Sequence, residues 1–251
     1  MKTQFGNVTY DSSHEKEVRE ELVSHFRQCP IPDDEILSNL GLFINSKNLS
    51  RILFMNHLYQ QIIDIPGIIV EFGVRWGQNV AAFAALRGIY DAFNRHRKIV
   101  GFDTFTGFPS ISDKDGRTSL AKIGGLAVSD NYVDYLGKLL ELHEQDNPLS
   151  HIKKNELIAG NATVEIDDYL KNHPETIISL AYFDLDLYEP TKRCLEAIRP
   201  HLVKGSVIGF DELNDPDSPG ETVALSEAFG LNNLRLKRYR YASRVSYLVV
   251  E

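Results

Sequence analysis

The stretch GIIVEFGVRWGQNVAAFAALRGIYDAFN, residues 67 to 94, decides the fold class of this sequence. Its first part, residues 67–74, is short, rich in β-branched side chains and almost entirely apolar, as is typical of a strand in the middle of a parallel sheet. A helical pattern begins at Gln78, directly after a turn that contains Gly73 and Gly77. The stretch therefore predicts the strand–turn–helix unit from which α/β folds are built.

The same alternation continues toward the C-terminus. Further strands are predicted at residues 98–103, 156–161, 176–186 and 205–212, and helices at residues 162–173, 190–202 and 220–230. This order predicts a doubly wound, mostly parallel sheet. The last two runs, residues 234–241 and 245–251, are separated by about three residues, which is too few for a helical crossover. We therefore expect an antiparallel hairpin at the edge of the sheet.

Two regions fall outside this alternation. Helical spacing predicts N-terminal helices at residues 14–29 and 47–64. We interpret residues 1–64 as a helical appendage or lid and residues 65–251 as the α/β domain. An insertion at residues 104–155 is longer than a simple crossover needs and contains a predicted helix at residues 131–145. Long connections at the carboxyl edge of such a sheet are commonly functional lids.

The composition argues against several classes of function. The 251 residues are 43% hydrophobic, which is ample for a core, and the net charge of −8 gives no reason to expect nucleic acid or an anionic membrane as partner. No run approaches the roughly 18 apolar residues of a membrane span, and the first residues are too polar for a signal peptide. We therefore expect a cytoplasmic protein whose two distant cysteines, Cys29 and Cys194, are reduced.

Acidic residues follow two neighbouring strands of the predicted sheet. In the segment YFDLDLYEP, residues 182–190, Asp184 and Asp186 project to the same side if the strand continues, and Asp211 and Glu212 end the next strand. Such neighbours repel, so a divalent cation, a bound cationic group or shared protons should be present. Oxygen ligands suit Mg²⁺ or Mn²⁺ better than Zn²⁺. In the alternative interpretation Asp186 and Asp211 cap the following helices and no metal binds.

The ends of the first two strands favour an adenosine-containing ligand. Gly73 and Gly77 allow a tight turn and bring backbone N–H groups close to a ligand at the helix start. Asp103 ends the second strand, where an acid typically accepts the ribose hydroxyls of such a ligand. The alternatives are a turn cap for Asp103 and simple packing roles for the glycines. The GxxxG spacing departs from the GxGxxG pattern of dinucleotide-binding proteins, which argues against a nicotinamide dehydrogenase.

With these residues, the sequence resembles the macrocin O-methyltransferase family, which methylates sugar hydroxyls on macrolides and other natural products with S-adenosylmethionine. The resemblance rests on residues 65–81, 101–109 and 184–212 and covers roughly residues 47 to 230. It implies a class I methyltransferase-like Rossmann fold, the cofactors S-adenosylmethionine and Mg²⁺, and a sugar-containing acceptor.

The resemblance also implies roles for individual residues. The cofactor would contact Glu71, Gly73, Val74, Gly77, Asp103, Thr104, Asn161 and Asp184. The metal would be held by Asp184, Asp211 and Glu212, although the family usually has Asp-Asp where this chain has Asp-Glu. Two sugar oxygens on the cation would lower the pKa of the hydroxyl to be methylated. Asp184 or Asp186 would take its proton, with His57 and His143 as further candidates.

Basic residues raise the question of the acceptor. Arg238 and Arg240 of the predicted hairpin, with Lys114, Arg117 and Lys122 of the insertion, would meet the diphosphate of a nucleotide-linked sugar. A solvated face of a late strand is the plainer interpretation. Two other functions stay open, a catechol-type O-methyltransferase and a non-catalytic adenosine-ligand binder. We also expect a homo-oligomer that assembles through the N-terminal helices.

Overall fold

The computed structural model describes residues 12–116 and 121–251 and contains a seven-stranded sheet of order β3-β2-β1-β4-β5-β7-β6. The first five strands are parallel, whereas β7 is antiparallel to both of its neighbours. The strands are β1 (Ile68–Phe72), β2 (Ile99–Asp103), β3 (Asn155–Ala159), β4 (Ile178–Phe183), β5 (Leu202–Phe210), β6 (Lys237–Arg238) and β7 (Ser246–Val249). The predicted doubly wound sheet with an antiparallel C-terminal hairpin is confirmed.

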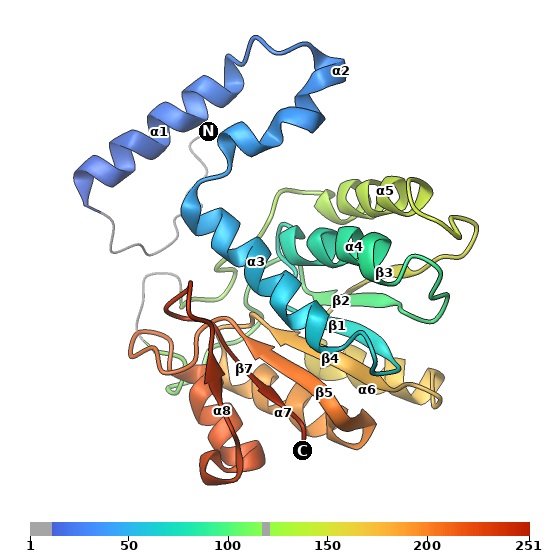
Figure 1. Ribbon diagram of the computed structural model, residues 1–251. Helices are drawn as coiled ribbons and strands as arrows, with labels where there is room; N and C mark the ends of the chain where they lie inside the picture. Colours follow the sequence, from blue (N-terminus) through green and yellow to red (C-terminus); the bar gives the residue numbers. More distant parts are fainter. Residues whose placement is uncertain (1–11, 117–120) are drawn as a thin grey trace.

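Helices cover both faces of the sheet (Figure 1). One face carries α3 (Ser46–Gln61), α4 (Gln78–Tyr90) and α5 (Tyr132–Gln145), and the other carries α6 (Ala162–Asn172), α7 (Tyr188–Ile198) and α8 (Gly220–Phe229). This arrangement follows from the β-branched, nearly continuous apolar strands, since a strand in the middle of a parallel sheet has both faces buried. Each face has its own core cluster, because successive side chains of a strand point to opposite sides.

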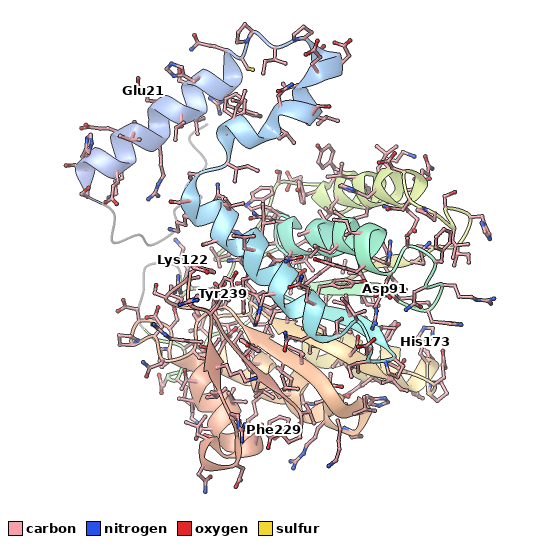
Figure 2. The ribbon with its side chains drawn as sticks, viewed as in Figure 1. Glu21, Asp91, Lys122, His173, Phe229 and Tyr239 are labelled. Carbon is pink, nitrogen blue, oxygen red and sulfur yellow. The ribbon has the colours of Figure 1, made fainter. Side chains whose placement is uncertain are left out.

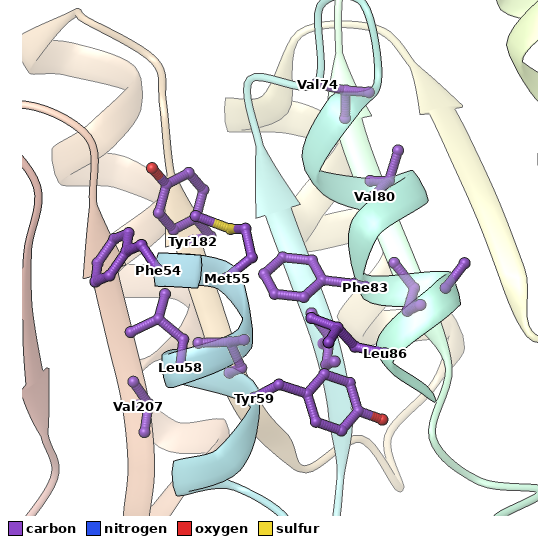
Figure 3. Packing of buried hydrophobic residues seen from close by; sticks show 14 of the residues in the cluster. Phe54, Met55, Leu58, Tyr59, Val74, Val80, Phe83, Leu86, Tyr182 and Val207 are labelled. Carbon is purple, nitrogen blue, oxygen red and sulfur yellow. The ribbon is translucent and has the colours of Figure 1, made fainter. Parts of the chain in front are cut away.

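Helix α3 is packed firmly onto the sheet. Its buried face inserts Phe54, Met55 and Leu58 beside Tyr182 and Val207 of the strands (Figure 3). Full burial of an apolar side chain of this size contributes about 1.5–3 kcal/mol. The division predicted at residue 64 stays a prediction, but the C-terminal half of α3 shares its core with the α/β domain.

The segment before α3 is arranged differently. Helices α1 (Ser13–Arg27) and α2 (Asp33–Ile36) and the 3₁₀ segment η1 (Leu37–Phe43) are described in full and contain no buried residue. They extend away from the sheet in Figure 1, with Phe26 and Phe43 in edge contact at 5.0 Å between ring centroids. Among the described residues, no helix is both long and apolar enough to cross a membrane.

The insertion between β2 and β3 contains the expected helix, α5, and is anchored beside the start of α7. Asp115 is buried, and its Oδ1 accepts a hydrogen bond of 2.5 Å from the backbone N–H of Tyr188. Tyr188 lies two residues after Asp186, so the insertion lies next to the predicted site. Both cysteines are free, as expected.

Candidate active site

The carboxyl ends of β4 and β5 bring Asp184 and Asp211 together. The N–H of Asp184 donates to the carbonyl of Phe72 at 2.9 Å, and that of Asp211 donates to the carbonyl of Phe183 at 3.0 Å. Strand β4 ends at Phe183, and Asp186 has a left-handed backbone with φ +60°. The strand therefore ends three residues before its predicted end at Asp186, and the condition for Asp184 and Asp186 to project to the same side, a strand that continues through both, is not met.

A cationic side chain from a distant element lies between these two acids. The Arg51 Nη1 of α3 donates to Asp211 Oδ1 at 2.9 Å, and Nη2 forms an ion pair with Asp184. The Nε of Arg51 donates to Asn79 Oδ1 at 3.1 Å. The acidic cluster was expected to need a cation, and here an arginine of the same chain supplies positive charge. Sequence reasoning missed Arg51, and its only signal was an arginine within an otherwise amphipathic helix.

Glu212 faces another arginine. It is 1% exposed, its Oε2 forms an ion pair with Arg244, and Arg244 also lies 3.1 Å from Asp215 Oδ2. Oε1 of Glu212 has no hydrogen-bond partner among the described residues. Within residues 12–116 and 121–251, no group of three or more His, Cys, Asp or Glu side chains is arranged to hold a metal ion. Of the three predicted metal ligands, Asp184 and Asp211 thus pair with Arg51, and Glu212 pairs with Arg244.

Burial and mutual repulsion act together on this cluster. Burial, and secondly the charge of Asp211, raise the pKa of Asp184 to about 8 and that of Asp186 to about 6. Glu221 of α8 is fully buried, accepts from the N–H of Leu185 at 3.1 Å through Oε1, and has a pKa raised by burial and by Asp186. The acids therefore outnumber the arginines beside them, which favours a positively charged ligand.

The helix-cap interpretation of the acids is wrong. Helix α7 starts after Leu187 and α8 after Pro219, and neither of these N-cap residues makes a side-chain cap hydrogen bond; the first N–H of α7, that of Tyr188, donates to Asp115 of the insertion instead. Asp211 instead accepts from Arg51 and, at 3.1 Å, from the hydroxyl of Tyr182. Asp211 therefore bonds to side chains at the carboxyl ends of the strands, and neither Asp186 nor Asp211 is the N-cap of the helix that follows it.

Glu71 has the chemistry expected for the amino-acid end of the cofactor. It is fully buried, its Oε1 accepts from Asn79 Nδ2 at 2.9 Å, and its Oε2 has no hydrogen-bond partner in the described part of the chain. Burial raises the pKa of Glu71 well above its usual value. A buried carboxylate oxygen without a partner is costly, and an ammonium group would satisfy it. The residue therefore fits a ligand that carries an amine.

The glycines after β1 have packing roles that the structure makes explicit. Gly73 has φ +91°, and a Cβ there would overlap the carbonyl oxygen of Asp184 on the neighbouring strand end. Gly77 has φ +79°, is the N-cap of α4, and lies against Leu136 of α5. Both turns require glycine, and Gly73 lets the ends of β1 and β4 approach each other closely. Val74 between them is buried in the core.

The residues expected at the ribose and adenine follow the next two strands. Asp103 is the last residue of β2. Its Oδ1 accepts from the N–H of Phe105 at 2.6 Å, in the turn after β2, and its Oδ2 from that of Arg75 at 2.8 Å, in the turn after β1. Asn161 follows β3, is exposed, and caps α6 by accepting from the N–H of Thr163 at 3.1 Å. Thr104 donates to the carbonyl of Gly107 at 2.6 Å. Asp103 therefore accepts backbone hydrogen bonds from the turns after β1 and β2, so the turn-cap alternative describes its contacts in the structure.

Neither histidine candidate contacts the acidic residues in the described structure. The Nε2 of His57 lies 2.9 Å from the hydroxyl of Tyr247, and its ring packs against Tyr239 of the C-terminal hairpin. Burial lowers the pKa of His57 below its usual value. His143 is in the last turn of α5. A direct role as proton acceptor is therefore poorly supported for both.

Comparison with known proteins gives close structural relatives. No protein-family model matches the chain, and no curated protein matches its sequence. The crystal structure of CalS11, a calicheamicin methyltransferase, is 43% identical, covers 96% of this chain and 94% of that chain, and has a TM-score of 0.94. An apo structure of CalS11, described as a TDP-rhamnose 3'-O-methyltransferase of calicheamicin biosynthesis, is 40% identical, covers 96% of each chain and has a TM-score of 0.85.

A more distant relative supports the fold alone. The O-methyltransferase NovP is 18% identical, covers 80% of this chain and 79% of that chain, and has a TM-score of 0.59. The identity and coverage of the CalS11 matches are sufficient to assign the family, and the seven-stranded sheet has the strand order of a class I methyltransferase. The chain therefore belongs to the macrocin O-methyltransferase-like family of sugar O-methyltransferases and is an S-adenosylmethionine-dependent O-methyltransferase.

Proposed function

We propose that the acceptor is a hydroxyl group of a nucleotide-linked deoxysugar made for a natural product. One observation carries this proposal: a TDP-rhamnose 3'-O-methyltransferase is 40% identical over 96% of this chain. The family assignment leaves the acceptor open, because related enzymes with the same fold methylate different hydroxyls. The particular sugar and the position methylated need a direct assay.

Cofactor binding would use the ends of the first three strands. When bound, S-adenosylmethionine supplies the methyl group. Glu71 would hold the ammonium of the cofactor, the turn with Gly73, Val74 and Gly77 would admit its methionine part, and Asp103 with Thr104 would face its ribose. Asn161 would lie near the ribose or adenine. The support is the order of these residues along one sheet edge, together with the Oε2 of Glu71, which has no hydrogen-bond partner within residues 12–116 and 121–251.

Proton removal would fall to Asp184 or Asp186. A general base works best when its pKa lies near the operating pH, and burial raises the pKa values of these two acids to about 8 and about 6. A carboxylate oxygen of either residue would accept the proton of the acceptor hydroxyl as the methyl group is transferred. Asp184 also adjoins Gly73, so this acid is next to the cofactor turn.

A divalent cation would be held by Asp184 and Asp211. Their carboxylates converge on one guanidinium, so both can reach one cation in the same place. Glu212 is the third ligand expected from the resemblance, but its pairing with Arg244 makes it a weaker candidate. Oxygen donors of this kind suit Mg²⁺. When bound, the ion would lower the pKa of the acceptor hydroxyl.

Arg238 and Arg240 of the hairpin are the cations proposed to meet the diphosphate. Lys114 is engaged elsewhere, since its Nζ lies 2.7 Å from Glu227 Oε1. Lys122 stays a candidate, and Arg117 lies outside the described residues. Arg238 and Arg240 are exposed, on a hairpin that packs against α3 through Tyr239.

Methyl transfer from S-adenosylmethionine to a panel of acceptors tests the proposal. The panel contains TDP-linked deoxysugars, the same sugars without nucleotide, and catechols, each with and without Mg²⁺. We expect turnover with one or more TDP-sugars and little with the free sugars, because the diphosphate contributes binding. Turnover with catechols alone would select the catechol-type alternative. Binding of S-adenosylhomocysteine without turnover on any acceptor, measured by calorimetry, would favour a non-catalytic binder.

Assembly into a homo-oligomer through the N-terminal helices is a further part of the proposal. Val23 and Phe26 of α1 and Leu37 and Leu42 of η1 are exposed to 50%, 45%, 76% and 68%. Apolar surface on this scale favours association with a second copy. Light scattering would compare the particle mass of the unaltered chain with that of Phe26→Ser. If α1 contributes to the contact, the unaltered chain should have the larger mass.

A further inference from the structure

The position of Arg51 raises a question about the acidic cluster that it occupies. Its guanidinium uses three nitrogens on three partners, Asp184, Asp211 and Asn79. Asn79 in turn donates to Glu71, so Arg51 belongs to a continuous network between the cofactor turn and the ends of β4 and β5. The arginine therefore touches the same two carboxylates that are proposed to hold the divalent cation.

Arg51 and a divalent cation cannot use these oxygens in the same way at the same time. A carboxylate oxygen that accepts a hydrogen bond from a guanidinium has less charge to offer an inner-sphere metal. Two cations a few ångströms apart also repel, and this repulsion is strong where burial lowers the effective dielectric constant. Binding of the metal to Asp184 and Asp211 would therefore have to displace the guanidinium.

The fold leaves the Arg51 side chain a route to solvent. The side chain of Arg51 is 29% exposed, and the residues that anchor α3 in the core, Phe54 and Leu58, lie further along the helix. Around Arg51, Leu49 and Leu53 are 45% and 41% exposed. A long arginine stem can turn toward solvent by rotation about its own side-chain bonds while the C-terminal half of α3 stays packed.

We propose that Arg51 is a built-in counter-cation that competes with the divalent cation for Asp184 and Asp211. In the absence of metal it neutralises the two acids and ties the first turns of α3 to the strand ends. Metal binding releases it, and with it the restraint on residues 46–53, which are joined to η1 and, through α2, to α1. This inference rests on the proposed metal site, and it adds a link between occupation of that site and the N-terminal segment.

Mn²⁺ affinity without cofactor or acceptor tests the competition directly. Titration followed by electron paramagnetic resonance would compare the unaltered chain, Arg51→Met and Arg193→Met. Arg193 forms an exposed ion pair with Asp167 on other helices, so its substitution removes an arginine–aspartate pair without touching the cluster. We expect Arg51→Met to bind Mn²⁺ about tenfold more tightly, which is about 1.4 kcal/mol, and Arg193→Met to bind as the unaltered chain does.

The possible results separate this inference from the metal site itself. Equal or weaker Mn²⁺ binding by Arg51→Met would overturn the competition and leave the metal site standing. If neither the unaltered chain nor Arg51→Met binds Mn²⁺, or if binding survives Asp184→Asn and Asp211→Asn, both the competition and the metal site would be overturned. Hydrogen exchange of the unaltered chain provides a second measurement: Mn²⁺ should speed exchange in residues 46–53 and leave the core of α3 unchanged. Slower exchange there would contradict the proposed release.

Discussion

Two charge networks lie at opposite ends of the sheet, and they differ in how completely their polar atoms are satisfied. Figure 2 labels Asp91 near the amino ends of the parallel strands and Tyr239 beside their carboxyl ends. At the amino end, Arg97 is 1% exposed and donates to the carbonyls of Gly67 and Ile62, to the hydroxyl of Ser179 and to Asp91, at 2.7–2.9 Å. One buried arginine thus ties four segments together.

The network at the carboxyl end is left unbalanced. Glu71, Glu212 and Glu221 each keep a buried oxygen that has no hydrogen-bond partner among the described residues. Arg51 is more exposed than Arg97, and it faces acids whose pKa values burial raises. Buried polar groups are normally paired, so such exceptions need a reason. The comparison indicates that the Arg97 network serves the fold, whereas the Arg51 network is built for a ligand.

Removal of the two arginines should have very different effects on stability. Arg97→Met leaves Asp91 and several backbone carbonyls buried without their partner, and we expect it to lower the free energy of unfolding by about 3–5 kcal/mol. Arg51→Met, the matched substitution at the other end, should cost less than about 1 kcal/mol, because the pair is partly exposed and the acids can bind protons. Urea denaturation measures both. Equal losses would remove the distinction between the networks.

Substitution of Asp184 or Asp211 should change the activity of the enzyme more than its stability. Asp184→Asn, which removes a proposed base and metal ligand, and Asp211→Asn, which removes a proposed metal ligand, should each lower turnover by about 100-fold or more. The urea midpoint should not fall, because a neutral side chain replaces an acid whose ionised form burial disfavours. Asp167→Asn, which alters an exposed ion pair with Arg193, is the control and should keep full turnover. Normal turnover after both cluster substitutions would rule out a role for these acids in the reaction.

The sequence predicted the scaffold well because the fold depends on periodic patterns. Runs such as residues 67–74 have the apolar character of buried parallel strands, and they predicted the sheet and its antiparallel hairpin, although the hairpin strands β6 and β7 are shorter than the predicted runs. The end of β4 was misjudged by three residues, since apolar alternation through Asp186 looks like a continued strand. Gly73 lies against the backbone of Asp184 and Gly220 against that of residues 186–188, so the chain after β4 makes close tertiary contacts that have no local signal in the sequence.

The site was predicted in part for a similar reason. Acids at neighbouring strand ends must converge in a parallel sheet, so the approach of Asp184 and Asp211 follows from topology. Arg51 is 133 residues from Asp184 and 160 from Asp211 along the chain. Its partners depend on the crossing of α3 over the sheet, which no sequence pattern specifies. The need for a cation was predictable from repulsion, but its source was not.

The pH dependence of stability should have opposite signs at the two ends. The raised pKa values of Asp184 and Asp186 mean that the folded state holds these protons more tightly than the unfolded state, so their contribution is present below pH 4 and is lost as pH rises through about 6 and about 8. The pKa of Asp91 is lowered, because hydrogen bonds, first from Tyr59, outweigh its burial, so its contribution is lost as pH falls below 3.8.

Urea denaturation between pH 5 and 8.5 follows the carboxyl end, since Asp91 is ionised throughout that range. The lowered pKa of His57 adds a rise in stability with pH in the lower part of the range, so the profile is measured in a His57→Gln background. We expect the free energy of unfolding to fall as pH rises, and Asp186→Asn to reduce the slope in the lower part of the range. Saturating Mn²⁺ should remove most of the decline, because a bound cation favours the ionised acids. A flat or rising profile for His57→Gln alone would mean that the arginines already balance the cluster.

The exposed arginines of the C-terminal hairpin, Arg238 and Arg240, should have the smallest effect on substrate binding. Arg238→Ala with Arg240→Ala should raise the KM for a TDP-sugar about three- to tenfold with kcat little changed, because a solvated contact to a diphosphate contributes about 1 kcal/mol. Arg235→Ala is the matched control, since Arg235 lies on the same segment and pairs with Glu251 at 3.4 Å. The effect should shrink with added salt, because the screening length for exposed charges, about 8–10 Å at physiological ionic strength, becomes shorter as salt is added. An unchanged KM would assign the basic face of the hairpin to solvent, and the diphosphate would then have to be bound by cations of the insertion.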